Sequence, residues 1–231
     1  MATFNTITYC SECTKHHGTF DVLSQEELSR LNSSKYEVHF KAGETIFKQG
    51  SALTHIACIN RGLAKILIEG PHQKNLVIKL LKCPDIVIGP GLYLDQRHHY
   101  SLIAVTDVSA CLMETKVLQE IIDKNNQFSK KLLQDSTLKR IHNYDQLINL
   151  TQKNMSARIA DTFLYLSGEV YKSLEFTMDI SRQDLADMSA MTKESAIRII
   201  KNLKESNVIE LEGNDLKILD KNGLIKISQV G

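Results

Sequence analysis

The chain of 231 residues is 42% hydrophobic and 24% charged, with 28 lysines and arginines against 27 aspartates and glutamates. This composition suits one or two globular domains with buried cores, and it excludes collagen-like, disordered and disulfide-stapled chains. The net charge of +1 gives no overall attraction to nucleic acids or acidic membranes, so any basic surface must be local. No apolar run approaches the roughly 18 residues of a membrane-spanning helix, and the first residues do not form a secretory signal. We therefore expect a cytoplasmic protein without a membrane partner, whose five cysteines stay reduced unless they bind metal or sense an oxidant.

We expect residues 1–19 to be an N-terminal arm and residues 20–115 to be a small antiparallel β-domain. Ser24 and Glu27 form a capping box, which predicts a short helix near the start of this domain. After it, β-rich runs such as Tyr36–Phe40 alternate with glycine turns. Short strands separated by glycine at this spacing predict a β-roll of the jelly-roll type.

Residues 116–153 contain no glycine or proline and are rich in helix-forming residues. Apolar residues recur there at steps of mostly three or four, which predicts connecting helices, one of them about 25 residues long. Such a helix is about 37 Å long, more than one small domain needs. We interpret its apolar stripe as a dimer seam, and the alternative is a helix packed within its own chain. The seam residues that we select are Leu132, Leu133, Ile141 and Ile148.

Residues 154–231 have the pattern of a winged helix-turn-helix. Ser181 and Asp184 form a capping box, which marks the start of one helix, and Thr192 can cap the next. Two helices joined by a turn of three or four residues form a helix-turn-helix. The β-rich runs on either side of Gly213–Asn214 predict a hairpin, the wing.

The second helix of this pair is amphipathic, and its polar side suits contact with DNA. A recognition helix presents its N-terminal residues to base edges, where Arg pairs with guanine and Glu accepts from cytosine. Lysines farther along such a helix reach phosphates. The candidate DNA-binding residues are Ser181, Arg182, Thr192, Lys193, Glu194, Ile197, Arg198 and Lys201. The charge of this region does not by itself indicate DNA binding, because the residues from Thr151 onward include 11 basic and 12 acidic ones. The alternative is a solvated face on a winged helix that docks protein.

Two segments resemble one known family. Residues 40–50 and 59–65 resemble the beginning of a cyclic-nucleotide-binding-type β-roll. Residues 180–186 and 192–200 resemble the helix-turn-helix of Crp/Fnr-type bacterial transcription regulators. The resemblance spans about residues 20–228, in the family's order. No phosphate-binding loop, nucleophile elbow or zinc-protease motif argues for an enzyme.

The resemblance implies an α+β fold with an antiparallel β-roll, a long dimerisation helix and a C-terminal winged helix-turn-helix. It also implies a homodimer that binds a palindromic double-stranded DNA operator and works with RNA polymerase, without enzymatic activity. Glu194 and Arg198 fall on the family's base-reading positions and Lys193 on a third, which implies a half-site with a TGA-like core. Ala190 stands where the family's turn often has glycine.

The family's cyclic-nucleotide cassette is not preserved. In the family, a Gly-Glu pair binds ribose and an Arg-Ser pair binds phosphate. Here Pro90 follows Gly89, and Tyr100 stands where the arginine would be. A buried phosphate without its guanidinium is poorly compensated, so the sequence argues against cyclic AMP as the effector.

The cysteines indicate a second kind of signal. Cys10 and Cys13 form a C-x-x-C motif, a spacing that lets two thiolates share a metal or cluster. The resemblance places Cys111 at the distant cluster cysteine of the oxygen-sensing Fnr branch. That branch has another cysteine about six residues after its C-x-x-C, where this chain has Gly18–Thr19. An iron–sulfur or redox site at Cys10, Cys13 and Cys111, sensing oxygen, nitric oxide or redox state, is therefore one hypothesis.

The fourth ligand of such a site is not fixed by the sequence. The candidates are His16, His17, Cys58 and Cys83. We expect Cys58 and Cys83 to be buried core thiols, and the same interpretation applies to Cys111 if there is no metal. The alternative for Cys10 and Cys13 is an arm with two reduced thiols or a redox-active dithiol.

Haem is a less favoured cofactor. His98 and His99 lie where an effector would bind, but adjacent residues of a strand point to opposite faces. We expect both to be solvated loop side chains. Two further readings stay open, namely a regulator without a small-molecule effector and a cyclic-nucleotide-domain-like protein whose winged helix docks protein.

Overall fold

The computed structural model describes residues 17–230, so Cys10, Cys13 and His16 lie outside the described part of the chain. The chain divides into two compact units. The first comprises the residues up to Ile68 together with Lys79–Ile141, and the second comprises Glu69–Ile78 together with the residues from His142 onward. Within residues 17–230, no helix is both long and apolar enough to cross a membrane.

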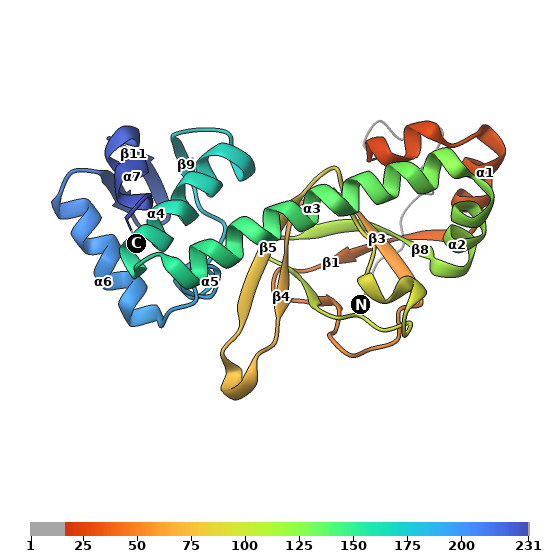
Figure 1. The fold of residues 1–231 in the computed structure, drawn as a ribbon, viewed down its shortest axis with the longest axis horizontal. Coiled ribbons are helices and arrows are strands. Elements are labelled where there is room, and N and C mark those ends of the chain that lie inside the picture. The colour runs from red at the N-terminus through yellow and green to blue at the C-terminus, as the bar shows by residue number, and fades with distance from the viewer. Residues whose placement is uncertain (1–16, 231) are drawn as a thin grey trace. The chain divides into compact units, whose positions relative to one another are not determined.

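The first unit is built on two antiparallel sheets (Figure 1). One sheet has the strand order β1-β8-β3-β6 and the other the order β2-β7-β4-β5. The strands are β1 Lys35–Phe40, β2 Thr45–Phe47, β3 His55–Arg61, β4 Leu63–Ile68, β5 Leu76–Lys82, β6 Asp85–Val87, β7 Ser101–Ala104 and β8 Val108–Glu114. Gly62 makes the turn between β3 and β4 with φ +86, and a Cβ there would lie 2.2 Å from the carbonyl oxygen of Asp107. Only glycine fits this turn.

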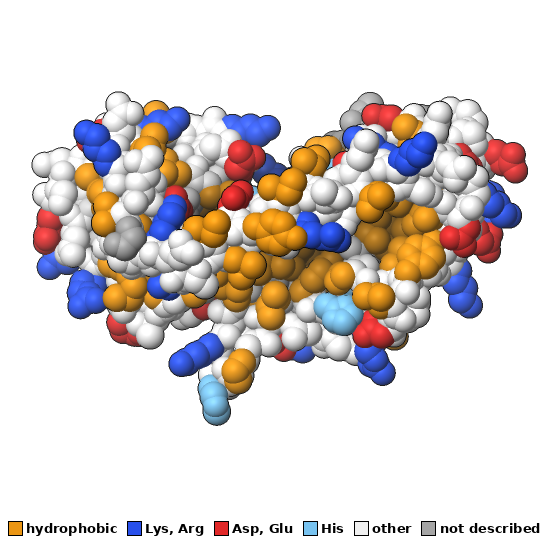
Figure 2. Space-filling model, in the orientation of Figure 1, with side chains coloured by type: hydrophobic (Ala, Val, Ile, Leu, Met, Phe, Trp, Pro, Cys, Tyr) orange, Lys and Arg blue, Asp and Glu red, His pale blue; other side chains and the backbone are white. Residues whose placement is uncertain are grey.

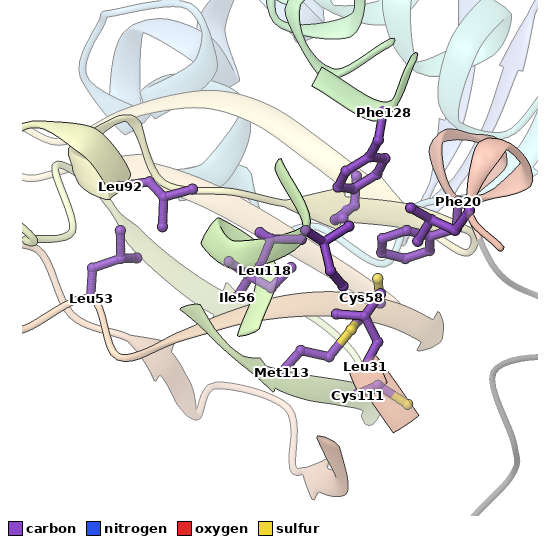
Figure 3. Packing of buried hydrophobic residues seen from close by; sticks show 13 residues of the cluster. Phe20, Leu31, Leu53, Ile56, Cys58, Leu92, Cys111, Met113, Leu118 and Phe128 are labelled. Carbon is purple, nitrogen blue, oxygen red and sulfur yellow. The ribbon is translucent and has the colours of Figure 1, made fainter. Parts of the chain in front are cut away.

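Helical segments pack on one face of the β1-β8-β3-β6 sheet. They are η2 Gly18–Val22, α1 Gln25–Ser33, α2 Thr115–Lys124 and the first turns of α3 Asn126–Gln152. The predicted capping box of Ser24 and Glu27 is confirmed at the start of α1. The rings of Phe20 and Phe128 stack with centroids 6.1 Å apart, which joins η2 to α3. Beneath them lies one apolar cluster that includes Cys58, Cys111 and Met113 (Figure 3).

Helix α3 has 27 residues, close to the length expected from the sequence. Of the four seam residues, Leu133, Ile141 and Ile148 are exposed, with Leu133 66% accessible. Leu132 differs, because it is partly buried against the apolar cluster of the first unit. Leu138, Tyr144 and Leu147 add to the exposed apolar residues of the helix.

The second unit contains the helix-turn-helix and its wing (Figure 1). Its elements are α4 Met155–Tyr165, the π-helical η5 Leu166–Val170, β9 Glu175–Thr177, α5 Arg182–Met188, α6 Lys193–Glu205, β10 Ile209–Glu212, β11 Asp215–Ile218 and α7 Lys221–Ser228. The predicted hairpin is β10-β11, and β9 adds a third strand beside β11. The core of the second unit includes Phe163, Leu185 and Leu203.

Candidate functional site

Side-chain caps set the starts of the two helices of the helix-turn-helix. At α5, Ser181 Oγ accepts a hydrogen bond from Asp184 N at 3.1 Å, and Asp184 Oδ2 accepts from Ser181 N at 2.9 Å. At α6, Thr192 Oγ1 accepts from Ser195 N at 3.2 Å. Such caps satisfy backbone N–H groups that have no partner within the helix. Both predicted helix starts are confirmed, and the roles of Ser181 and Thr192 in this structure are those of caps.

The turn between α5 and α6 is fixed by contacts with α4 and with α5. Ala190 adopts φ +47, a left-handed conformation that glycine reaches more easily. The buried hydroxyls of Ser189 and Thr162 lie 2.9 Å apart, and Met191 N donates to Ala186 O at 3.1 Å. The chain therefore accepts strain at the position where the family's turn often has glycine.

Helix α6 buries one side and exposes the other. Ala196, Ile199, Ile200 and Leu203 are buried. We call the outward residues the exposed face of α6, and they are Lys193, Glu194, Ile197, Arg198 and Lys201. Their spacing places them on adjacent turns of one side of the helix. Ile197 is the unusual member, because an isoleucine side chain is 47% accessible there amid charged residues.

The wing is joined to the helix-turn-helix by Arg182. This arginine is half-buried, and its Nη2 donates to the carbonyl oxygen of Gly213 in the turn between β10 and β11. Burial lowers the pKa of Arg182, and its Nη1 has no hydrogen-bond partner within residues 17–230. Unlike Arg198, Arg182 is engaged within the protein.

The described cysteines lie in different surroundings. Cys58 and Cys111 are buried, and Asn60 Nδ2 lies 3.1 Å from Cys111 Sγ in donor geometry. Cys83 is half-buried between β5 and β6, so the prediction of a core thiol is right for Cys58 and wrong for Cys83. Cys83 lies in the short connection after β5 and not within a strand of the sheet. Within residues 17–230, no three His, Cys, Asp or Glu side chains form a group that could hold a metal ion.

The structure shows that the prediction for one of the two adjacent histidines in the β-roll loop is wrong. His98 is only 3% accessible, and its ring stacks on Phe47 with centroids 4.3 Å apart, so it is not solvated. Burial lowers its pKa. His99 is solvated as predicted, with Nε2 3.1 Å from Asp95 Oδ1. Burial raises the pKa of the Tyr100 hydroxyl.

Two contacts, one of Cys111 and one of Arg182, could not be predicted from the sequence. The donor of Cys111 is Asn60, a residue of β3, and the acceptor of Arg182 is the backbone of Gly213. Neither contact has a signal in the sequence, because each joins residues that are more than 30 positions apart.

Both the β-roll part and the helix-turn-helix part of the chain match models of known domains. Residues 37–125 match the model of the cyclic nucleotide-binding domain, and residues 157–227 match that of the Crp-like helix-turn-helix domain. The chain is 24% identical over 213 residues to the transcriptional activator protein FnrL of Cereibacter sphaeroides, covering 88% of this chain and 85% of the relative. It is 22% identical to the nitrogen fixation regulation protein FixK of Bradyrhizobium diazoefficiens, covering 92% and 90%. The solved structure of FixK2 from Bradyrhizobium japonicum superposes with a TM-score of 0.77 at 17% identity, covering 85% of this chain and 98% of that one.

A β-roll of the cyclic-nucleotide-binding type, followed by a long helix and a Crp-like helix-turn-helix, defines a class of DNA-binding transcription regulators. The chain belongs to the Crp/Fnr family within this class. The expected fold is confirmed. The family consists of transcription regulators, which confirms that the protein is not an enzyme.

Proposed function

We propose that this regulator binds a palindromic operator as a homodimer and reads each half-site through the exposed face of α6. The observation that carries the proposal is that face itself, where Glu194, Ile197 and Arg198 project together from the first turns of the helix. Arg198 suits the O6 and N7 atoms of guanine, and Glu194 suits the N4 amino group of cytosine. Lys201 suits a phosphate, which positions the protein without specifying sequence. The resemblance to the Crp/Fnr family implies a TGA-like core in each half-site.

The apolar stripe of α3 supports the homodimer. Leu133, Leu138, Ile141 and Ile148 are all more than half accessible. Figure 2 shows hydrophobic side chains gathered along the course of this helix. Exposed apolar residues at helical spacing are stabilised by burial, and a second copy of α3 offers the same stripe in return. A symmetric pair then presents two copies of α6 to two half-sites.

We place the signal input of the regulator at the cysteines. Cys10 and Cys13 supply the C-x-x-C motif, and Cys111 supplies a buried thiol with a hydrogen-bond donor, Asn60. An amide that donates to sulfur favours the thiolate, which is the form that binds metal. An iron–sulfur centre at these residues would make the regulator respond to oxygen, nitric oxide or redox state. The regulator would act in the cytoplasm with RNA polymerase as its partner.

Selection from a pool of random double-stranded DNA tests the proposed function. The wild-type chain is expected to enrich palindromes with two TGA-like half-sites, and its affinity should fall steeply with salt. Arg198→Ala is expected to enrich a degenerate version of the same site. Enrichment of no sequence by the wild-type chain would contradict the proposal and would favour a winged helix that docks protein.

A further inference from the structure

A small cavity lies within the second unit, where β5, the C-terminal part of α3, α4 and the end of α5 meet. Its volume is about 210 Å³, and every lining residue belongs to this unit. The lining residues are Leu76, Val77, His142, Asp145, Gln146, Asn149, Leu150, Lys153, Asp161, Thr162, Tyr165 and Met188. The volume is about seven times that of one water molecule in the liquid, so the cavity suits a ligand of about six to nine non-hydrogen atoms.

Part of the lining is apolar. The apolar residues come from β5, α3 and the last position of α5, and they are Leu76, Val77, Leu150 and Met188. Gln146 Nε2 donates to the carbonyl oxygen of Ile78 at 2.7 Å, which fixes β5 against α3 at the cavity. An apolar lining of this kind suits a short hydrocarbon group.

Most polar side chains of the lining are engaged within the protein. Lys153 Nζ forms an ion pair with the carboxylate of Asp161. The buried hydroxyl of Thr162 lies 2.9 Å from Ser189 Oγ. The amide of Gln146 is bound to β5. These groups shape the cavity, and their hydrogen bonds and charges are already matched.

Two acceptors of the lining remain without a partner. Asn149 Oδ1 is buried and has no hydrogen-bond partner within residues 17–230. A buried carbonyl oxygen without a donor costs free energy, and a donor on a ligand removes this cost. Asp145, one turn before Asn149 on α3, is exposed and forms no ion pair within the same residues. Since Lys153 and Asp161 neutralise each other, the Asp145 carboxylate is the unmatched charge of the lining, His142 aside.

An aromatic ring completes this set of groups. The rings of Tyr165 and His142 both line the cavity, with centroids 6.1 Å apart. The face of a tyrosine ring attracts a cation. A carboxylate and an amide oxygen accept charge-assisted hydrogen bonds from an ammonium group. These three kinds of group together therefore favour an organic cation over a neutral molecule or an anion.

We propose that this cavity binds a small primary amine in its ammonium form. The ammonium group donates to Asp145 and to Asn149 Oδ1, and the hydrocarbon part lies against the apolar residues that include Met188. The proposal goes beyond the proposed function, because it depends neither on the cysteines nor on DNA.

The test uses the full-length chain with ¹³C in its methionine methyl groups and isopentylamine as the probe. The Met188 methyl resonance, assigned with Met188→Leu, reports from the cavity, and Met155 of α4, which does not line it, is the internal control. We expect a saturable shift of the Met188 resonance and none of the Met155 resonance. Isopentanol, which has the same shape without the charge, should bind about tenfold more weakly. The anion 3-methylbutanoate should not bind.

Substitutions on α3 test the two acceptors. Asp145→Asn should abolish the preference for isopentylamine over isopentanol, and Asn149→Leu should weaken isopentylamine binding about tenfold. Asn143→Leu is the matched control, because Asn143 is exposed on α3 and does not line the cavity. It should bind isopentylamine like the wild type. Circular dichroism checks the fold of each variant, and the exposed position of Asp145 makes Asp145→Asn the variant that keeps the fold.

Three results would each overturn the proposal. The first is a Met188 resonance that isopentylamine does not shift. The second is equal affinity of the wild-type chain for the amine, the alcohol and the carboxylate. The third is a folded Asp145→Asn variant that keeps the wild-type preference for the amine. Operator selection tests the proposed function separately, so it would survive any of these results.

Discussion

Arg182, in the first turn of α5, donates through Nη2 to the carbonyl oxygen of Gly213 in the turn of the wing. The contact joins the helix-turn-helix to the β10-β11 hairpin across 31 positions of sequence. A charged donor on a neutral carbonyl gives one of the stronger hydrogen bonds. This side chain therefore ties the wing turn to the start of α5.

Replacement of Arg182 by alanine should lower stability. We expect Arg182→Ala to reduce the free energy of unfolding by about 1–2 kcal/mol, because a partly buried charged donor is lost. The measurement is urea denaturation of the wild type and the variant. Gln183→Ala is the matched control, since its exposed Nε2 only bonds Asp187 one turn away, and we expect a change within about 0.5 kcal/mol. Equal effects of the two substitutions would show that the contact with the wing contributes nothing.

Arg198 and Lys201 should differ in the kind of DNA binding that they support. Arg198→Ala is expected to weaken binding to the selected operator by about 1–3 kcal/mol and to relax base preference, with little effect on random DNA. Lys201→Ala should weaken binding to both DNAs alike and reduce the salt slope by about 1. Fluorescence anisotropy titrations at several salt concentrations measure both quantities. An equal loss on operator and random DNA for Arg198→Ala would remove its assigned role.

Ile197 should read a thymine methyl group. It is the exposed apolar residue between Glu194 and Arg198 in the exposed face of α6. Apolar side chains distinguish thymine by contact with its C5-methyl group. We therefore expect deoxyuridine in place of thymidine at one position of each half-site to weaken wild-type binding. Ile197→Ala should bind the thymidine and deoxyuridine operators equally. A wild-type affinity that no such substitution changes would contradict this assignment.

Two neighbouring leucine positions separate dimer contacts from core contacts. Leu133 is exposed on α3, whereas Leu132 packs against the core of the first unit. Leu133→Glu should give monomers with an intact fold, because a charge would be buried in the seam. Leu132→Ala should lower the thermal midpoint yet leave the dimer intact. Light scattering after size-exclusion chromatography measures the mass, and a dimeric Leu133→Glu variant would contradict the assigned seam.

His98 should make stability depend on pH. Burial lowers its pKa below the value of about 6.5 that histidine has in an unfolded chain. At a pH between the lowered pKa of His98 in the folded protein and its pKa of about 6.5 in the unfolded chain, the unfolded chain binds more protons than the folded one. The contribution of His98 to stability is therefore full above about pH 6.5 and falls as the pH drops below that value. One such group contributes at most about 1.4 kcal/mol per pH unit, and His17 acts with the same sign.

The matched pair His98→Phe and His99→Gln tests this dependence. His98→Phe keeps a ring against Phe47 and removes Nδ1, which has no partner within residues 17–230. We expect it to be at least as stable as the wild type at pH 7 and to lose less stability between pH 7 and pH 5. His99→Gln is the control for the loss of an exposed histidine in the same loop. Denaturation at several pH values gives the slopes, and an unchanged slope in His98→Phe would refute the argument.

Local features of the fold could be predicted from the sequence because their causes are local. The caps at Ser24, Ser181 and Thr192 each use a hydrogen bond to a residue three positions ahead. The buried and exposed sides of α6 follow from the helical period. These are the features that locate the exposed face of α6.

Features that depend on strand pairing could not be predicted in this way. The three-residue strand β9 joins the wing only through its register with β11. The opposition of Cys58 and Cys111 likewise depends on how β3 aligns with β8. The burial of His98 follows from contacts of its loop with residues near Gly50, such as Gly50 N to His98 O at 2.7 Å. A pattern within one segment carries no information on such a partner.

The most direct test of the account changes the spacing of the two half-sites. A symmetric dimer that presents two copies of α6 fits half-sites about one helical turn, or ~34 Å, apart. Inserting five base pairs, about half a turn, between the half-sites turns the second site to the opposite side of the DNA. We predict that the affinity for this DNA falls to the affinity for random DNA. Sedimentation should show two chains bound to each copy of the original operator. Unchanged affinity after the insertion, or one chain per operator, would contradict the homodimer and its palindromic operator.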